Sequence, residues 1–345
     1  MIQKLNINDF LLQSAGHPVL DVRSPAEYKH AHIPGSVSLP LFNDEERATI
    51  GTLYKQNGRE AAMMKGLEYY GTNMQRILRE LEKITTDKVL FVHCWRGGMR
   101  SGVVAWMLDL FGYKVGTLNK GYKAFRSLVL SSFNEPRRLV ILGGKTGSAK
   151  TAVIQQLFQQ SQQVIDLEQL ACHKGSAFGA LGEASPPSQE QFENDLFMKF
   201  RETNAAIPVL LEDESQRIGP VNIPNALWAQ MRGAPVLYLE IPFEERLQHL
   251  VKTYGGFALE DLKASTLRIR KRLGGLQTTN TIQLLENGEY RSAFSILLQY
   301  YDRTYMRATE QRNSTMIRRV ESTTTDAATN ASLVLQALGS RSAVV

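Results

Sequence analysis

Twice along this chain of 345 residues, an apolar strand pattern runs directly into a glycine-containing loop and then into a helical pattern. The first instance is VLFVHCWRGGMRSGVVAWML, residues 89–108, and the second is RLVILGGKTGSAKTAVIQQLF, residues 138–158. Strands that alternate with helices in this way pack as a mainly parallel sheet covered by helices. The loop between such a strand and helix directs backbone N–H groups at one point, which suits an anion. These two stretches predict an α/β protein with two anion-binding loops.

The two α/β patterns follow each other, and the segment NEPRR at residues 134–138 separates them. We therefore predict a parallel-sheet domain over residues 1–133 and a second α/β domain over residues 137–345. From Pro242, a favourable first helical residue, the second domain is predicted to be largely helical up to Arg312. The predicted strands are residues 18–23, 89–94 and 113–121 in the first domain, and 138–144, 163–167, 207–213, 235–241 and 316–322 in the second.

The composition excludes several classes of protein. Hydrophobic residues make up 43% of the chain and charged residues 21%, which is typical of a globular protein with buried cores. No run approaches the roughly 18 apolar residues of a membrane span, and the start, MIQKLNINDFLL, lacks the features of a signal peptide. The two cysteines, Cys94 and Cys172, do not form a secreted disulfide framework. We therefore expect a cytoplasmic monomer that makes no membrane contact and leaves Cys94 able to react.

The net charge of +6 is concentrated in one segment. Residues 268–319 contain ten basic and four acidic side chains, an excess equal to that of the whole chain. Tyr290, Tyr300, Tyr301 and Tyr305 are interleaved with them. This combination suits a polyanion with exposed bases, and it is equally typical of a solvated helix face over core tyrosines. The candidate residues for binding such a polyanion are Arg268, Arg270, Lys271 and Arg272.

The first loop centres on a thiol. Cys94 follows the apolar strand, and Gly97 and Gly98 permit a tight turn after it. Arg100 offers a planar guanidinium to an oxyanion, and together with the loop amides it favours the nucleophilic thiolate form of the cysteine. A buried structural cysteine at a strand end is the alternative, and the surrounding RGGMR disfavours it. We predict that Cys94 and Arg100 are catalytic and that the anion loop comprises Trp95, Arg96, Gly97, Gly98 and Met99.

Upstream, LDVRSPAEYKHAHIPGSVSLP at residues 20–40 resembles the signature of rhodanese domains, and the resemblance covers residues 5–130. Domains of this kind carry sulfur as a persulfide on the loop cysteine. Many of them have a six-residue active loop, whereas Cys94 to Arg100 spans seven residues here. The longer loop also resembles that of phosphatases with the same fold, whose signature is His-Cys, five residues and Arg. Either the chain is a phosphatase, or its group donor is a phosphate derivative.

The second loop, LGGKTGSAKT at residues 142–151, matches a phosphate-binding P-loop. The ammonium group of Lys150 would bind a phosphate through its charge, and the hydroxyl of Thr151 could hold a magnesium ion. The pattern expects glycine at Ala149, and the methyl group there counts against ordinary nucleotide turnover but not against anion binding. A plain glycine-rich turn is the alternative. The predicted diphosphate-binding residues are Gly144, Thr146, Gly147, Ser148, Ala149, Lys150 and Thr151.

Further polar residues follow two predicted strands of the second domain. The carboxyl ends of parallel strands converge on the ligand crevice, so these side chains are candidates for substrate or supporting contacts. The position after an apolar strand is also where nucleotide enzymes place the acid that organises magnesium, although a polar strand end is the alternative. Cysteine and histidine spacing typical of a metal site is absent, and we predict no resident metal. The candidates are Asp166, Glu168, His173, Asp213, Glu214 and Arg217.

Six motifs together resemble the tRNA 2-selenouridine synthase family over nearly the whole chain. They are CWRGGMRSG, GTLYKQNGREAA, DLEQLACHKGSAFG, PSQEQFEN, EDESQRIG and RIRKRLGG. The resemblance implies a transferase that acts on 2-thiouridine at the wobble position, U34, of tRNAs for lysine, glutamate and glutamine. It implies no tightly bound cofactor and two co-substrates: geranyl diphosphate alkylates the sulfur, and selenophosphate then supplies selenium. Selenophosphate suits the loop at Cys94, and the diphosphate suits the P-loop.

Three other functions stay open on the sequence. A rhodanese-fold phosphatase fits the seven-residue loop but leaves the second domain and the basic segment without a role. An ATP-dependent tRNA sulfurtransferase fits both domains and would show tRNA-stimulated ATPase activity. A binding module with a degenerate rhodanese domain would be supported by loss of the nucleophile, whereas Cys94 and Arg100 are both present.

Overall fold

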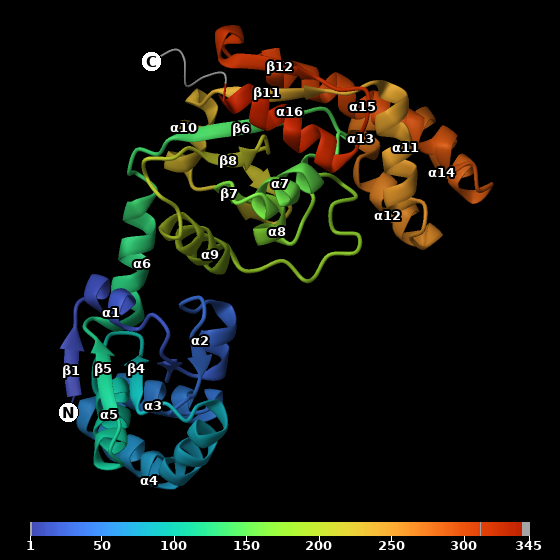
Figure 1. Cartoon of the computed structure of the whole chain (residues 1–345). Coiled ribbons are helices and arrows are strands. Elements are labelled where there is room, and N and C mark those ends of the chain that lie inside the picture. The colour runs from blue at the N-terminus through green and yellow to red at the C-terminus, as the bar shows by residue number, and fades with distance from the viewer. Residues whose placement is uncertain (1, 311, 340–345) are drawn as a thin grey trace. The chain divides into compact units, whose positions relative to one another are not determined.

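The computed structural model describes residues 2–310 and 312–339 (Figure 1). The side chains of residues 305–310, including Tyr305 and Arg307, lie outside this description. The chain forms two compact units: one runs to residue 132 and includes residues 193–195, and the other contains residues 133–192 and the chain from 196 onward. Each unit contains a five-stranded parallel sheet, which confirms the predicted α/β class.

The sheet of the first unit consists of β1 (Ile2–Leu5), β2 (Val19–Asp21), β3 (Val37–Ser38), β4 (Val89–His93) and β5 (Lys114–Leu118). Its strand order is β1-β5-β4-β2-β3, so the strand that leads to Cys94 is central. The last four residues of β4 are buried, as expected for a parallel strand covered on both faces. The three predicted strands are confirmed, whereas the two edge strands, β1 and β3, were not predicted; the first three residues of β1 are exposed, so it lacks a buried apolar run.

Six helices surround this sheet. The loop after β4 leads into α5, and the loop after β5 leads into α6, so both helices begin at the carboxyl edge of the sheet. Val104, Ala105 and Leu108 of α5 are fully buried in the core of this unit. The helices are α1 (Ile7–Gln13), α2 (Pro25–His30), α3 (Asp44–Gln56), α4 (Gly58–Ile84), α5 (Met99–Leu110) and α6 (Gly121–Ser132).

The sheet of the second unit consists of β6 (Leu139–Gly144), β7 (Val164–Ile165), β8 (Val209–Glu212), β11 (Val236–Glu240) and β12 (Ile317–Glu321). The order is β12-β11-β6-β8-β7, which confirms all five predicted strands and places the P-loop strand β6 in the centre. A short antiparallel pair, β9 (Arg217–Ile218) and β10 (Val221–Asn222), was not predicted. The helices that accompany the sheet are α7 (Lys150–Gln159), α8 (Leu167–Ala171), α9 (Gln189–Arg201), α10 (Asn225–Gly233) and α16 (Ala327–Gly339).

The predicted helical part of the second unit is also present, and it has a core of its own. Its helices are α11 (Phe243–Tyr254), α12 (Leu259–Arg268), α13 (Arg270–Leu273), α14 (Gly275–Glu286) and α15 (Tyr290–Glu310), followed by the short η1 (Ser314–Met316). Leu262, Leu285 and Leu298 are buried there together with Phe178, which comes from the loop after α8. This loop is therefore anchored on the helical core while it lies close to the end of β7.

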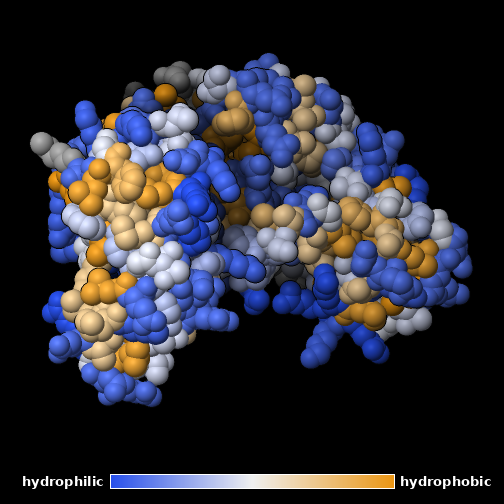
Figure 2. Space-filling model, turned by 90° about the horizontal axis from the view of Figure 1, so that it is seen from below, coloured by the Kyte–Doolittle hydropathy of each residue, from blue (hydrophilic) through white to orange (hydrophobic). Residues whose placement is uncertain are grey.

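Within residues 2–310 and 312–339, no helix has both the length and the apolar character that crossing a membrane requires. On the face drawn in Figure 2, apolar patches are interrupted by hydrophilic side chains.

Candidate functional site

The thiol of Cys94 lies where β4 ends, and only 3% of the residue is exposed. Its Sγ lies 3.2 Å from Oγ of Ser101, in the first turn of α5. Trp95, Arg96 and Met99 of the same loop are exposed around it. Four of the five predicted loop residues are therefore an exposed rim beside one buried sulfur, and the hydroxyl of Ser101 can donate to its thiolate.

Two glycines fix the shape of this loop. Gly97 and Gly121, the latter at the start of α6, both have a φ of 59°, in the left-handed region. A Cβ at Gly97 would lie 2.3 Å from the carbonyl oxygen of Leu118, and one at Gly121 would lie 2.2 Å from that of Cys94. No side chain fits at either position, because backbone packs directly on backbone there.

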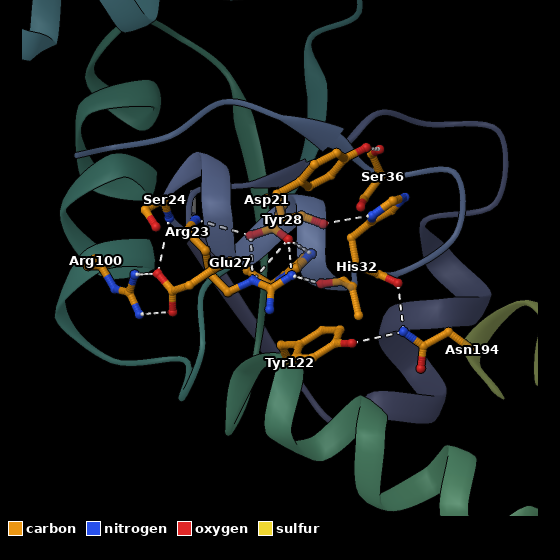
Figure 3. A network of polar contacts seen from close by, with 12 residues as sticks. Asp21, Arg23, Ser24, Glu27, Tyr28, His32, Ser36, Arg100, Tyr122 and Asn194 are labelled. Atoms are coloured by element: carbon orange, nitrogen blue, oxygen red, sulfur yellow. Dashed lines mark hydrogen bonds and ion pairs between the residues drawn. The ribbon is translucent and has the colours of Figure 1, made fainter. Parts of the chain in front are cut away.

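Arg100 is held at the loop by Glu27, on α2 (Figure 3). Its Nη1 and Nη2 donate to the two carboxylate oxygens of Glu27 at 2.7 and 3.3 Å. Glu27 also accepts a hydrogen bond from the backbone N–H of Ser24. Burial tends to raise the pKa of Glu27, but the hydrogen bonds and charge of Arg100 outweigh it and hold the pKa below its ordinary value. The remaining guanidinium N–H groups can serve an anion in the loop.

A second buried charge pair supports the strand beneath the loop. Arg23 and Asp21 are both almost fully buried, with Nη2 and Oδ2 2.6 Å apart, and the guanidinium lies 3.9 Å from the centre of the Tyr122 ring. His93, the neighbour of Cys94, is also buried, and burial lowers its pKa to about 4. His93 is therefore neutral near pH 7 and too weak a base to take the thiol proton.

The P-loop joins β6 to α7. Nζ of Lys150 donates to the carbonyl of Gly144 at 2.9 Å, and the hydroxyl of Ser148 donates to the carbonyl of Lys145 at 2.7 Å. Ala149 has φ 55° and ψ 30°, a left-handed conformation that costs a residue with a Cβ about 1 kcal/mol. The P-loop pattern expects glycine at this position, and glycine would adopt the conformation without strain. The alanine therefore strains the backbone of the loop.

An arginine from the helical part of the unit contacts the backbone of the P-loop. Arg246, on α11, donates to the carbonyl of Thr146 at 3.0 Å. The same guanidinium forms two hydrogen bonds of 2.8 Å with Asp302, on α15. Gly147 is packed so closely that a Cβ there would lie 2.9 Å from the carbonyl oxygen of Arg246. The sequence pattern identified the loop but not this buried arginine.

Two carboxylates meet at the P-loop threonine. Oγ1 of Thr151 donates to Oε2 of Glu168 at 2.5 Å, and the carboxyl group of Glu214 lies close enough to interact with that of Glu168. Burial raises the pKa of both glutamates, and their mutual repulsion raises that of Glu214 further. Asp213 instead forms an ion pair with the buried Arg312. Of the two acids predicted after β8, Glu214 therefore interacts with the partner of the P-loop threonine, whereas the carboxylate of Asp213 is paired with Arg312.

A second carboxyl pair lies beside the first, and one member was missed in the sequence. Glu212 is fully buried at the end of β8, where its Oε2 accepts from the backbone N–H of Leu167 at 3.0 Å. In the described part of the chain, neither Oε1 of Glu212 nor Oδ2 of Asp166 accepts a hydrogen bond, and the two buried carboxyl groups lie close enough to interact with each other. Burial, followed by the charges of Asp166 and Glu168, raises the pKa of Glu212 well above its ordinary value. One proton held between the two carboxyl groups satisfies both oxygens.

We expect Glu212→Gln to stabilise the protein at pH 8 and to make little difference at pH 4. The unfolded chain loses this proton near the ordinary pKa of 4.5, whereas the folded protein keeps it to higher pH. The folded state therefore binds more protons above pH 4.5, and its stability falls by about 1.4 kcal/mol per pH unit until the raised pKa is reached. Glutamine does not ionise, so it removes this loss. Urea unfolding at both pH values, with exposed Glu202→Gln as the control, measures the difference; an equal loss of stability at both would contradict the assignment.

The remaining candidates gather around the loop after α8. The ring of His173 packs against Gly179 and Gly219, and Nε of Arg217 donates to the carbonyl of Gly219 at 2.9 Å. Burial, and then the charge of Arg268, lowers the pKa of His173. This loop therefore brings residues from α8, β9 and α12 together beside the carboxyl edge of the sheet.

Two buried tyrosines at the same loop were not recognised in the sequence as site residues. The hydroxyl of Tyr301 accepts a hydrogen bond from the N–H of Ala177 at 3.3 Å, and the ring of Tyr254 packs against Phe178 of the same loop. Burial raises the pKa of both, and the charge of Glu168 raises that of Tyr254 further. Both hydroxyls therefore stay protonated near the paired glutamates.

The structure divides the basic segment into paired and unpaired charges. Arg291 pairs with Glu244, and Arg319 pairs with Glu240. The four candidate tRNA contacts are instead exposed on α12 and α13, and none of them forms an ion pair with a residue in the described part of the chain. They are Arg268, Arg270, Lys271 and Arg272.

Among the residues that the structure describes, no group of three or more histidine, cysteine, aspartate or glutamate side chains is arranged to hold a metal ion. Two family models match the chain: a rhodanese-like domain over residues 7–128, and the AAA domain of tRNA 2-selenouridine synthase over residues 137–333. The second match covers more than half of the chain. The chain belongs to the tRNA 2-selenouridine synthase family. Both anion loops described above lie within these two matches.

Individual relatives agree with this family. The tRNA 2-selenouridine synthase of Nitrosomonas eutropha is 32% identical, and the alignment covers 87% of this chain and 90% of that protein. That of Nitrosomonas europaea is 36% identical, and the alignment covers 70% of this chain but 64% of the relative. Among solved structures, the N-terminal domain of a putative ATP/GTP binding protein from Clostridium difficile 630 is 33% identical over 37% of this chain and 99% of its own, with a TM-score of 0.34.

Proposed function

We propose that this chain converts 2-thiouridine at the wobble position of tRNA into 2-selenouridine. The observation that carries the proposal is the combination, within one member of this family, of a buried thiol in an anion loop and a separate P-loop. The two loops match two anionic co-substrates, selenophosphate at Cys94 and geranyl diphosphate at Lys150. The substrates are the tRNAs for lysine, glutamate and glutamine.

In the first step, the thiocarbonyl sulfur of the uridine attacks C1 of geranyl diphosphate. The C–O bond breaks with its electron pair on the diphosphate, and N3 of the base loses its proton. Lys150 stabilises the charge that develops on the leaving diphosphate. The hydroxyl of Thr151 and the carboxylate of Glu168 are oxygen donors of the kind that magnesium takes beside a phosphate, and such an ion would add positive charge there.

In the second step, selenide derived from selenophosphate adds to C2 of the alkylated base. The geranylthio group then leaves as a thiol, which a bare thiocarbonyl sulfur could not do. Cys94 is the nucleophile that breaks selenophosphate down, and Arg100, held by Glu27, binds its oxyanion. The two steps use different loops, so alkylation needs no protein thiol.

Nucleoside mass spectrometry of thiolated tRNA tests the proposal directly. Incubation with the protein and geranyl diphosphate should give S-geranyl-2-thiouridine, and addition of selenophosphate should convert it to 2-selenouridine. Absence of both nucleosides would refute the proposal. ATP hydrolysis stimulated by unthiolated tRNA would instead favour an ATP-dependent sulfurtransferase, and turnover of phosphotyrosine would favour a phosphatase.

The exposed cations on α12 and α13 are proposed to bind the tRNA backbone. Replacing Arg270, Lys271 and Arg272 together with alanine should weaken tRNA binding and reduce its dependence on salt. The slope of log binding constant against log salt concentration should become shallower by roughly 0.7–0.9 for each tRNA phosphate that the variant no longer neutralises. The matched control replaces Arg291 and Arg319, which are paired with acids and should matter less. Filter binding over a range of salt concentrations gives both quantities; an unchanged affinity and slope would remove this segment from the interface.

A further inference from the structure

The shape of the Cys94 loop favours a compact tetrahedral group over a nucleobase at the sulfur. Only 3% of Cys94 is exposed, and the rim of exposed side chains stands above it. The loop backbone cannot open around a larger group, because Gly97 and Gly121 press it against the turn before α6. A compact phosphoryl group therefore needs less room at the sulfur than the uridine ring does. This inference rests on the proposed use of selenophosphate.

The electron balance of selenophosphate cleavage distinguishes two modes of attack on such a group. If the thiolate attacked selenium, the electron pair of the P–Se bond would pass to phosphorus, which would be reduced from P(V) to P(III) and leave as phosphite. If the thiolate attacks phosphorus, the pair passes to selenium, phosphorus stays P(V), and hydrogen selenide leaves as an anion. Hydrogen selenide is a far stronger acid than the P–H bond of phosphite, so the selenide anion is much the better leaving group.

We propose that Cys94 attacks the phosphorus of selenophosphate and forms S-phosphocysteine, releasing hydrogen selenide as the nucleophile for the alkylated base. A sulfur–phosphorus bond forms and the phosphorus–selenium bond breaks. Water then attacks the same phosphorus, orthophosphate leaves, and the Cys94 thiolate is restored. No oxidant or reductant enters, and selenium is never bonded to the protein. The rhodanese-like loop thus acts as a phosphoryl-transfer site and not as a carrier of selenium.

Ser101 is positioned to assist the return of the thiolate. Its Oγ lies 3.2 Å from Sγ of Cys94, on the side of α5, and only 1% of the residue is exposed. When the S–P bond breaks, charge develops on sulfur, and the hydroxyl can donate to it. Arg100 and the amino end of α5 belong to the same loop region, and both can donate to the oxygens of a phosphoryl group on Cys94. Loss of the Ser101 hydroxyl should therefore slow hydrolysis of S-phosphocysteine more than its formation.

The test uses the full chain with chemically prepared selenophosphate and geranylated tRNA. Phosphorus NMR should show orthophosphate and no phosphite. Acid quenching followed by peptide mass spectrometry should show a phosphoryl group, and no selenium, on the peptide that contains Cys94. Ser101→Ala should accumulate phosphocysteine about tenfold, the effect of losing one hydrogen bond of about 1.4 kcal/mol to a charged atom. Cys172→Ser is the control and should behave as the unmodified protein does.

Phosphite, or selenium on the Cys94 peptide, would overturn the proposal, and so would a Ser101→Ala protein with no excess of phosphocysteine. These results are separable from failure of the proposed function. Phosphite together with 2-selenouridine would leave the function intact and overturn the attack at phosphorus. Phosphocysteine and orthophosphate without 2-selenouridine would support the attack at phosphorus and overturn the function.

Discussion

Replacing Cys94 by serine is expected to stop tRNA modification at S-geranyl-2-thiouridine. Serine keeps nearly the size of cysteine and fits beside Ser101, so the loop should retain its shape. Its hydroxyl is hardly ionised near pH 7 and is a far weaker nucleophile than a thiolate. Breakdown of selenophosphate should therefore fall to the limit of detection. Alkylation should continue at the rate of the unmodified protein, because it uses the sulfur of the tRNA and the P-loop.

The measurement is a nucleoside profile of thiolated tRNA treated with each variant and both co-substrates. Cys172→Ser serves as the matched control, since it changes the other cysteine of the chain and should complete both steps. Formation of 2-selenouridine by the Cys94→Ser protein would refute the role of this thiol. Loss of S-geranyl-2-thiouridine in the same protein would show instead that the two steps are not separable.

The parts of the site that the sequence predicted are those in which neighbours in sequence are neighbours in space. Cys94, its loop and Arg100 follow one strand, and Lys150 and Thr151 follow another, so a short apolar run and its loop were enough to locate each. The strand order could not be read in the same way, because it depends on pairing between distant segments, such as that of β1 with β5.

The parts that the sequence did not predict depend on contacts between distant segments. Glu27 was visible as part of a signature, but its partner Arg100 lies 73 residues away. Glu212 stands at the end of an apolar run. Its burial could be inferred only from the structure, which shows that every residue of β8 is buried. The choice between Asp213 and Glu214 depended on Arg312, which reaches Asp213 across 99 residues. Side-chain partners of this kind are set by packing, which a local pattern does not encode.

Lys150→Ala is expected to reduce geranylation of thiolated tRNA by about 100-fold while it spares the breakdown of selenophosphate. The diphosphate gains negative charge as the C–O bond breaks, and a fixed cation at the P-loop stabilises that charge more than it stabilises the bound substrate. Partial burial of Lys150 strengthens the effect, and the contact of Arg246 with the carbonyl of Thr146 helps to fix the loop in which the lysine lies. The assay is single-turnover formation of S-geranyl-2-thiouridine, with release of orthophosphate from selenophosphate measured in parallel.

The control for a general loss of positive charge is Lys199→Ala, which removes an exposed lysine of α9 that is paired with Glu202. Undiminished geranylation by Lys150→Ala would assign the P-loop to another ligand, and an equal loss of both activities would indicate damage to the fold.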